Sequence, residues 1–194
     1  MSECTETEVL ILGCGVAGGT VALCLADAGM PVTLVTRAAD PSDSNTNLAQ
    51  GGIIYKGHED SAALLVEDIL RAGAGHASHQ AATLLADEGP GLVERLLLER
   101  VGVVFDRVAD GTLSLALEGG HSLPRIIHAA DATGKAIEAA LVRALQAHPN
   151  VTLLLRHTAI DLLTPAHHSL NRLDIYAPLS CVGAYVLDQA TEQV

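Results

Sequence analysis

The chain has 194 residues, of which 49% are hydrophobic and 2% aromatic, and its formal net charge is −12 at pH 7. That length and apolar content are sufficient for one domain with a sizeable buried core. The acidic balance argues against nucleic acid or an anionic membrane as a partner, because both attract basic surfaces. It is typical of a soluble, cytoplasmic protein.

A stretch without charged residues, 9–26, lies near the start and is long enough to be considered as a membrane span. Glu6 and Glu8 precede it, whereas a secretory signal would begin with basic residues. Four glycines inside the stretch would also weaken a spanning helix. We therefore expect no membrane segment here.

The first predicted unit covers residues 8–37. Residues 8–12, EVLIL, have the β-branched and leucine-rich character of a buried parallel strand. A glycine-rich turn follows, and the helical pattern after it is expected to end at Gly29. Residues 31–37 form a second strand. Strand, turn, helix and strand in this order are the βαβ unit that a parallel sheet requires.

Residues 60–101 are predicted to form a helical insertion. Its first helix covers 60–73, where apolar residues recur with helical spacing. Two further helices are expected over 79–89 and 91–102. We expect Gly89-Pro90-Gly91 to separate them, because proline removes a hydrogen bond from a helix interior.

Residues 103–122 favour a β-hairpin with its turn at Asp110-Gly111. A helix is expected over 133–150, where Thr133 can cap its start and Pro149 marks its end. The remaining elements are one or two strands over 151–165, a loop over 165–178, and a strand from 181 that ends in a hairpin turn.

The cysteines form no CxxC pair and no zinc-ligand spacing, so we infer a reducing compartment. Cys14 and Cys24 stand in apolar surroundings, where a free thiol behaves as a small hydrophobic side chain. The pair His167-His168 has no cysteine or carboxylate at ligand spacing. No metal site is predicted.

Gly13, Gly15 and Gly18 form a GxGxxG pattern between the first strand and its helix. The first glycine permits a tight turn, the second allows the backbone to approach a pyrophosphate, and the third lets helix and strand pack closely. The positive end of the helix then faces the phosphates. This context favours a dinucleotide site over a glycine-rich packing turn.

The second predicted strand ends without the acidic residue that commonly holds a ribose hydroxyl. Thr36 and Arg37 stand there instead. Arg37 can contact the adenosine part of a cofactor or remain a solvated strand-end residue, and it leaves NADP conceivable. A NAD(P)-linked reductase is therefore an alternative.

Residues 44–52, SNTNLAQGG, form an uncharged loop that favours a flavin. The isoalloxazine ring is wide and planar with a polar edge, so a protein that holds it needs amide and hydroxyl groups and small residues. Gly51-Gly52 permits close backbone approach. Asn45, Thr46 and Gln50 can reach polar atoms. By composition alone, a polar surface loop is the alternative.

Several segments, taken together, resemble one known family. They are LILGCGVAGG at 10–19, NTNLAQGGI at 45–53, AGAGHASHQA at 72–81, GVVFDR at 102–107, EGGHSLPRIIHAADATG at 118–134, and HPNV followed by RHTAIDL at 148–162. These resemble the flavoproteins of the succinate dehydrogenase, fumarate reductase and L-aspartate oxidase family, and are most similar to the L-aspartate oxidase branch. The resemblance runs from about residue 8 to 164.

The resemblance implies a set of FAD contacts. The matching positions are Gly13, Cys14, Gly15, Val16, Ala17 and Gly18 for the pyrophosphate, Arg37 at the strand end, Ser44, Asn45, Thr46, Asn47, Leu48, Ala49, Gln50, Gly51 and Gly52 along the flavin, and Thr158 and Ala159 by the adenine. Asn45 stands where membrane-bound members carry a histidine attached covalently to FAD. The resemblance therefore implies FAD bound non-covalently.

The segment 118–122, EGGHS, resembles the part of the family that approaches the dicarboxylate substrate. In the L-aspartate oxidases its glutamate is associated with the substrate amino group. A carboxylate at Glu118 suits an ammonium group and would repel a plain dicarboxylate. His121 and Ser122 can hydrogen-bond a substrate carboxylate. A hairpin-edge glutamate is the structural alternative.

We predict an α/β, Rossmann-type FAD-binding domain with a parallel central sheet, inserted helices and a β-hairpin. Its expected parts are 8–37, the flavin loop 44–52, the helices of 60–101, the substrate-side segment 103–128, and the helix and strands of 133–194. The resemblance implies that 1–194 is an incomplete FAD domain, without the family's capping and C-terminal helical domains.

The resemblance also implies an activity. It is the FAD-dependent oxidation of L-aspartate to iminoaspartate, at the start of NAD biosynthesis, with oxygen or fumarate as electron acceptor. The alternatives are a soluble fumarate reductase or succinate dehydrogenase flavoprotein, which would act on a plain dicarboxylate, and a non-catalytic FAD-binding fragment. Turnover by these 194 residues alone is doubtful, because the general-base groups of the family would be missing.

Overall fold

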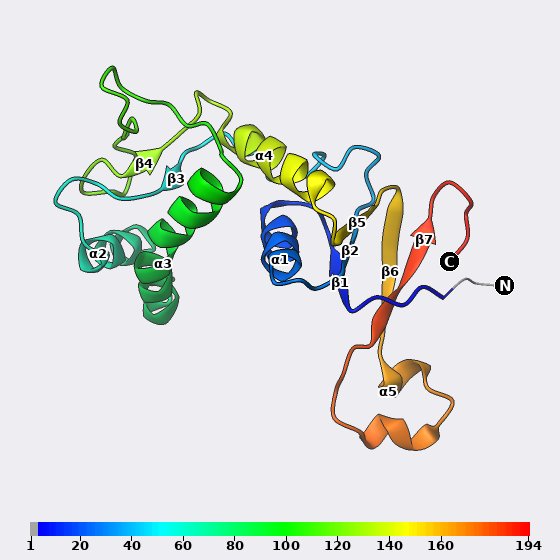
Figure 1. Cartoon of the computed structure of the whole chain (residues 1–194). Helices are drawn as coiled ribbons and strands as arrows, with labels where there is room; N and C mark the ends of the chain where they lie inside the picture. The colour runs from blue at the N-terminus through cyan, green and yellow to red at the C-terminus, as the bar shows by residue number, and fades with distance from the viewer. Residues whose placement is uncertain (1–3) are drawn as a thin grey trace. The chain divides into compact units, whose positions relative to one another are not determined.

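The structure, a computed structural model, describes residues 4–194, which form two compact units (Figure 1). Unit 1 combines Met1–Ser44 with Val142–Val194. Unit 2 is the intervening segment, Asn45–Leu141. Unit 1 contains a parallel sheet and a long antiparallel hairpin, whereas unit 2 is mainly helical.

The parallel sheet of unit 1 has three strands in the order β1-β2-β5. They are β1 (Val9–Leu12), β2 (Val32–Val35) and β5 (Val151–Leu154). Three of the four residues of the central strand β2 are buried, so its β-branched and leucine side chains form the middle of this core. The predicted parallel sheet is confirmed.

Helix α1 (Val16–Asp27) connects β1 to β2 and buries Ala22, Leu23 and Ala26. Gly29 adopts a positive φ of 90° just beyond the helix, and its N–H donates to Ala26 O at 2.9 Å. This is the glycine stop that the sequence predicts. Cys14 is buried as expected, but Cys24 is exposed, because it lies on the outer face of α1.

The antiparallel hairpin of unit 1 pairs β6 (His157–Leu163) with β7 (Gly183–Asp188). The expected loop between them is wrong, because it contains helix α5 (Pro165–His168) and the 3₁₀-helix η2 (Arg172–Tyr176). Pro165 starts α5, a position that its fixed φ suits. The predicted turn after β7 is confirmed, since Asp188 N donates to Gln193 O at 2.9 Å.

The helices of unit 2 are α2 (Ala62–Ala72), α3 (His79–Leu92) and a π-helix, η1 (Val93–Arg100). Ser61 and Ser78 cap α2 and α3, because the hydroxyl of each accepts the backbone N–H of the residue three positions later. Their buried apolar residues are Leu65, Ala82, Ala86, Val93 and Leu97.

The expected break at Gly89-Pro90-Gly91 is wrong. Pro90 lies inside α3, and the chain passes from α3 directly into η1. Proline lacks the N–H that a regular turn uses, and the wider turns of a π-helix are one way in which a helix absorbs such a defect. Burial of Val93 and Leu97 keeps the segment helical.

The sheet of unit 2 has two short antiparallel strands, β3 (Ile53–Ile54) and β4 (Ile126–Ile127). The expected hairpin over 103–122 is only partly correct. A turn does form at Asp110-Gly111, where Asp110 Oδ1 accepts the N–H of Thr112 at 2.9 Å, but it closes on one bridge, Arg107 to Leu113. Further along the segment, Ala116 forms an isolated bridge with Ile126 of β4.

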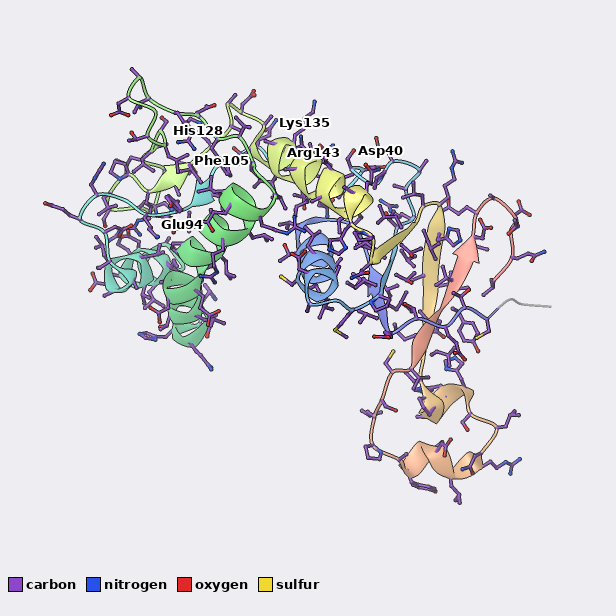
Figure 2. All side chains as sticks on the ribbon, viewed as in Figure 1. Asp40, Glu94, Phe105, His128, Lys135 and Arg143 are labelled. Carbon is purple, nitrogen blue, oxygen red and sulfur yellow. The ribbon has the colours of Figure 1, made fainter. Side chains whose placement is uncertain are left out.

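Phe105, the chain's one phenylalanine, anchors the core of unit 2 and is 3% exposed (Figure 2). Helix α4 (Thr133–Ala147) follows. Thr133 does not cap α4 as expected, because it is the first helical residue and its Oγ1 accepts the N–H of Ala129 at 3.0 Å. Within residues 4–194, no helix is both long and apolar enough to cross a membrane.

Candidate cofactor and substrate site

The glycine turn in unit 1 has the geometry that the pattern predicts. Gly13 has a φ of 102°, and its N–H donates to Val35 O at 2.8 Å, so the turn is fixed to the end of β2. A Cβ on Gly18 would lie 2.0 Å from Gly13 O, so a larger residue would push the turn away from α1. These are the tight-turn and close-packing roles of the first and third glycines.

The start of α1 suits a phosphate group. Gly15 is its N-cap, in extended conformation, and as a glycine it makes no side-chain cap hydrogen bond. Val16 and Ala17 are exposed at this end, whereas Cys14 is buried. A helix N-terminus without a side-chain cap presents N–H groups and a positive dipole end to an anion. The turn therefore fits the pyrophosphate of FAD.

The residues predicted to meet the adenosine are joined by Gln189. Its Nε2 donates to Arg37 O at 3.0 Å and to Thr158 Oγ1 at 2.8 Å. The strand end at Arg37 and the start of β6 at Thr158–Ala159 are thus held by one amide group, with the Arg37 side chain exposed. No local sequence signal points to Gln189, because 152 residues separate it from Arg37.

The flavin loop of unit 2 is packed on the start of α4. Gly134 N donates to Ala49 O at 2.9 Å, and a Cβ on Gly134 would lie 2.0 Å from Thr46 O. Only glycine permits this approach. Within the loop, Leu48 N donates to Asn45 O at 3.2 Å. The backbone is therefore ordered by its own turns and by α4.

Two of the loop's polar side chains, those of Asn45 and Gln50, are exposed. Asn45, Leu48, Ala49, Gln50 and Gly51 are exposed, while Ser44, Thr46, Asn47 and Gly52 are half-buried. An ordered backbone with exposed amide side chains and small residues fits the edge of a flat ring.

The end of the flavin loop meets the predicted substrate-side segment. Gly52 N donates to Glu118 Oε1 at 3.4 Å, and a Cβ on Gly52 would lie 2.1 Å from Ile126 Cγ2. The missing side chain at Gly52 lets strands β3 and β4 bring the loop to the Glu118 carboxylate. No local sequence pattern indicates this contact, because Gly52 and Glu118 are 66 positions apart in the chain.

Glu118 and His121 lie in one tight turn. His121 N donates to Glu118 O at 3.2 Å, and Gly120 between them has a φ of 89°. The Glu118 side chain is exposed. His121 is half-buried, and its Nδ1 is shielded and has no hydrogen-bond partner within residues 4–194. The turn therefore offers an exposed carboxylate that accepts one long hydrogen bond, from Gly52 N, and a shielded imidazole nitrogen without a partner in the described part of the chain.

A charged cluster supports this turn and was not predicted. Ser122 N donates to Asp68 Oδ2 at 2.8 Å, and Ser122 Oγ donates to Asp68 Oδ1. Arg125, 0% exposed, pairs with Asp68 at 3.2 Å and with Asp60 at 3.0 Å. Both donors of Ser122 are thus used by Asp68, whereas the sequence suggested that Ser122 could bind a substrate carboxylate. The sequence did contain one indication of this cluster. Asp68 lies three positions after Leu65, so the helical spacing places a charged residue on the apolar face of α2.

The Asp68 carboxylate is kept ionised. Burial opposes its ionisation, but hydrogen bonds from Ser122 and Arg71 and the charge of Arg125 outweigh that effect. They lower the pKa of Asp68 to about 2. Asp68 therefore remains charged near neutral pH.

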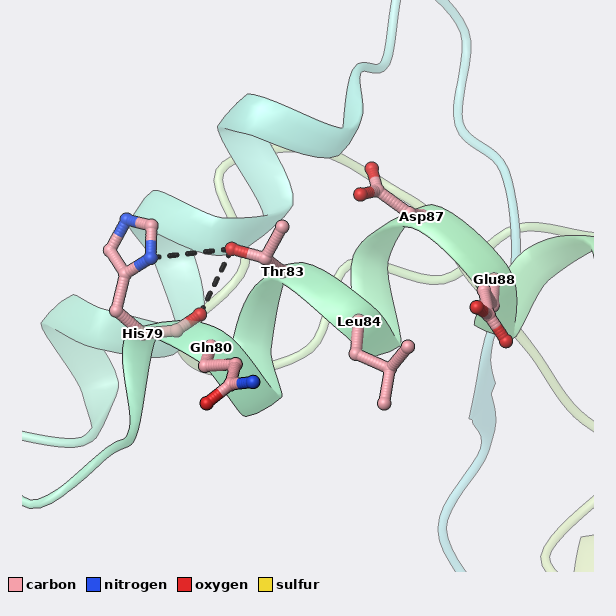
Figure 3. Close-up of a pocket in the computed structure, with 6 residues that line it drawn as sticks. All are labelled: His79, Gln80, Thr83, Leu84, Asp87 and Glu88. Carbon is pink, nitrogen blue, oxygen red and sulfur yellow. Dashed lines mark hydrogen bonds between the residues drawn. The ribbon is translucent and has the colours of Figure 1, made fainter.

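Two other features, a groove along α3 and a histidine pair in the hairpin, do not form a binding site. A groove of about 670 Å³ runs along α3 (Figure 3), and its lining residues are His79, Gln80, Thr83, Leu84, Asp87 and Glu88. All belong to one helix, and Thr83 Oγ1 donates back to His79 O at 2.9 Å. In the hairpin insertion, His168 pairs with Asp161 at 3.6 Å. Across residues 4–194 no three metal-ligating side chains converge.

A family model described as FAD binding domain matches residues 8–194. The chain belongs to this FAD-binding family. The matched range covers both the glycine turn and the flavin loop, and FAD is the family's cofactor. The close approaches at Gly18 and Gly134 are those that a dinucleotide and a flat ring require, so the residues present fit FAD.

The similar curated proteins are L-aspartate oxidases. The chain is 38% identical to L-aspartate oxidase 2-a of Nicotiana tabacum, 40% to L-aspartate oxidase of Halobacterium salinarum and 41% to L-aspartate oxidase 1 of Ralstonia nicotianae. The matches cover 96%, 84% and 93% of this chain, but only 27%, 31% and 33% of those proteins. The chain therefore spans a third or less of the relatives' length.

Solved structures support the fold. An open-conformation flavocytochrome c3 fumarate reductase matches 96% of this chain and 31% of its own, with a TM-score of 0.78 and 24% identity. Mycobacterium smegmatis Sdh1 in complex with UQ1 matches 92% of this chain and 30% of its own, with a TM-score of 0.76 and 24% identity. At this identity the likeness concerns the fold, an FAD-binding domain with mixed α/β structure.

Proposed function

We propose that this chain is the FAD-binding part of an L-aspartate oxidase, which oxidises L-aspartate to iminoaspartate as the first step of NAD biosynthesis. The L-aspartate oxidases at 37–41% identity support this assignment. When bound, FAD supplies the two-electron acceptor for the oxidation. Oxygen or fumarate is the proposed final acceptor, and the proposed setting is the cytoplasm, without membrane or nucleic acid.

The observation that carries this proposal is the contact between Glu118 and Gly52. The carboxylate lies at the end of the predicted flavin loop, with its side chain exposed. In that position it attracts the ammonium group of an amino acid and repels a plain dicarboxylate. The Nδ1 of His121 has no hydrogen-bond partner among residues 4–194, and in this proposal it meets a substrate carboxylate. Glu118 recognises the amine in this proposal, and His121 orients the substrate.

The proposed cofactor contacts are those that the family resemblance implies. In unit 1 they are Gly13 to Gly18 at the pyrophosphate, with Arg37, Thr158 and Ala159 towards the adenosine. In unit 2 they are Asn45 to Gly52 along the flavin, continuing from Ser44. Asn45 is an amide and cannot form the histidine-type covalent bond, so the proposed FAD is non-covalent.

The second candidate is a soluble fumarate reductase or succinate dehydrogenase flavoprotein. The fold likeness to a fumarate reductase favours it. In that case the substrate would be a dicarboxylate without an amino group, and Glu118 would have to be neutralised or turned away. A chain that binds FAD without catalysing a reaction is the third candidate.

One experiment separates the three candidates. The purified chain is incubated with FAD, dialysed, and treated without oxygen with L-aspartate or with succinate. We expect a retained flavin absorption band that L-aspartate bleaches and succinate does not. Bleaching by succinate alone supports the second candidate. A band that neither compound changes supports a binding module, and loss of the band on dialysis contradicts FAD binding.

The matched control is Glu118→Gln, which keeps the size and removes the charge. If Glu118 binds the substrate ammonium group, this variant should retain FAD and lose its preference for L-aspartate over succinate. An unchanged preference would contradict the role of Glu118 while leaving the cofactor assignment intact.

A further inference from the structure

The charged cluster beneath the 118–122 turn has no role in the proposal so far. Its Arg125 and Asp68 side chains are 0% and 1% exposed, and that of Asp60 is 11% exposed. Removing charges from water is costly, and a buried ion pair is seldom more stabilising than apolar residues of the same size. Such a cluster is therefore better explained by the geometry that it fixes than by stability.

The geometry that it fixes is that of the turn. Arg71 Nη2 donates to Gly120 O and to Ser122 Oγ, both at 3.2 Å. Asp68 accepts both donors of Ser122, as described above. Asp68 and Arg71 are three residues apart on α2 and pair with each other, so one helical turn contributes both groups.

The turn needs this support because of its own sequence. Gly119 and Gly120 give it little intrinsic preference for one conformation, and Gly120 adopts a φ of 89°. At its other end the backbone is held two residues before Glu118, where Ala116 N donates to Ile126 O at 2.8 Å. The Glu118 carboxylate itself accepts one long hydrogen bond, from Gly52 N to Oε1 at 3.4 Å. The direction of the Glu118 carboxylate therefore depends on contacts made two to four residues later.

We propose that Asp68 and Arg71 are positioning residues for substrate recognition. They hold Gly120 and Ser122 so that the Glu118 carboxylate stays at the end of the flavin loop, and they thereby set the preference for an amino dicarboxylate over a plain one. Neither residue contacts the substrate in this proposal. The selectivity part rests on the proposed function, whereas the control of the turn does not.

Three variants test this proposal in the full chain. Arg71→Met and Ser122→Ala remove contacts to the turn but keep the buried Asp68–Arg125 pair. Asp68→Asn removes the negative charge and one of the two acceptor oxygens, and it leaves Arg125 paired with Asp60, so the two milder variants carry the test if it fails to fold. Arg95→Met, an exposed arginine of the same unit, is the matched control.

The first readout is hydrogen exchange of the backbone amides of 118–122. Because hydrogen bonds to charged groups are strong, we expect Arg71→Met to speed exchange there roughly tenfold, with a similar effect in Asp68→Asn. The amides of β1 and β2 should be unchanged. The second readout is the ratio of L-aspartate to succinate affinity in the FAD-loaded chain, followed by the flavin spectrum.

We expect that ratio to fall roughly tenfold in Arg71→Met, by loss of one charged hydrogen-bond donor, while FAD affinity changes less than about twofold. Unchanged exchange in the turn would overturn the proposal. So would faster exchange with an unchanged ratio. If the parent chain binds FAD but not L-aspartate, the proposed function fails, and the exchange rates alone decide whether α2 sets the turn.

Discussion

Each of the two units is stabilised internally by a different kind of interaction. In unit 1 a ladder of apolar side chains in three parallel strands forms the centre, and Leu23, Val32 and Leu34 are almost fully buried. In unit 2 the sheet has two residues per strand, and a charged residue, Arg125, is as deeply buried as any isoleucine. The predicted nucleotide side thus rests on local apolar patterns, whereas the predicted substrate side depends on polar contacts between distant residues.

Removing the buried arginine should have the largest effect and should affect unit 2 first. Arg125→Met leaves Asp60 without this cation and leaves Asp68 with Arg71 as its one cationic partner in the described part of the chain. Breaking a buried pair in this way costs about 3–5 kcal/mol of unfolding free energy. Urea unfolding, with hydrogen exchange to separate the units, measures the loss. Arg37→Met, an exposed arginine of unit 1, is the control.

A loss of less than about 1 kcal/mol in Arg125→Met would place the pair among weak surface ion pairs. Equal loss of protection in both units would contradict the contrast between them.

Lowering the pH should destabilise unit 2 through Asp68, by less than the loss of Arg125 does. The pKa of Asp68 is lowered in the folded chain, from 3.8 to about 2, so its contribution to stability is present above pH 4. That contribution is lost as the pH falls from about 4 towards 2. Ser122→Ala removes a hydrogen bond that lowers this pKa. We expect the titration of Asp68, followed by NMR of its carboxyl carbon, to move to higher pH.

Unit 1 provides a matched control for that titration. Hydrogen bonds from the backbone and the hydroxyl of Ser42 lower the pKa of Asp40, which is exposed. Ser42→Ala should raise the pKa of Asp40 and leave that of Asp68 unchanged. If Ser122→Ala does not move the Asp68 titration, the hydroxyl is not what keeps this carboxylate charged.

The smallest expected effect concerns Gln189 in unit 1. Gln189→Leu loses the two hydrogen bonds that join Arg37 to Thr158. A neutral hydrogen bond contributes about 0.5–1.5 kcal/mol, so we expect FAD to bind roughly three- to tenfold more weakly. FMN lacks the adenosine, and its affinity should not change. Equal weakening of FAD and FMN, measured by fluorescence titration, would show that the change is not confined to the adenosine end.

Much of unit 1 could be predicted because its signals are local. The strands β1 and β2, the glycine turn and the helix stop at Gly29 all lie within thirty residues of one another and follow from side-chain spacing and glycine geometry. The sequence also indicated the turn at Asp110-Gly111. The sequence wrongly predicted a helix break at Pro90. In the structure α3 contains Pro90 and continues into η1, where Val93 and Leu97 are buried.

The sequence by itself determined the βαβ pattern, the composition of the loop 44–52 and the family resemblance. Tertiary structure alone decided that Gly52 meets Glu118, that Gly134 seats the loop, and that Gln189 joins Arg37 to Thr158. The physical reason is the sequence distance over which each kind of interaction acts. Periodicity and glycine conformation act over a few residues, whereas Ser122 reaches Asp68 across 54 positions, and only the folded chain brings such partners together.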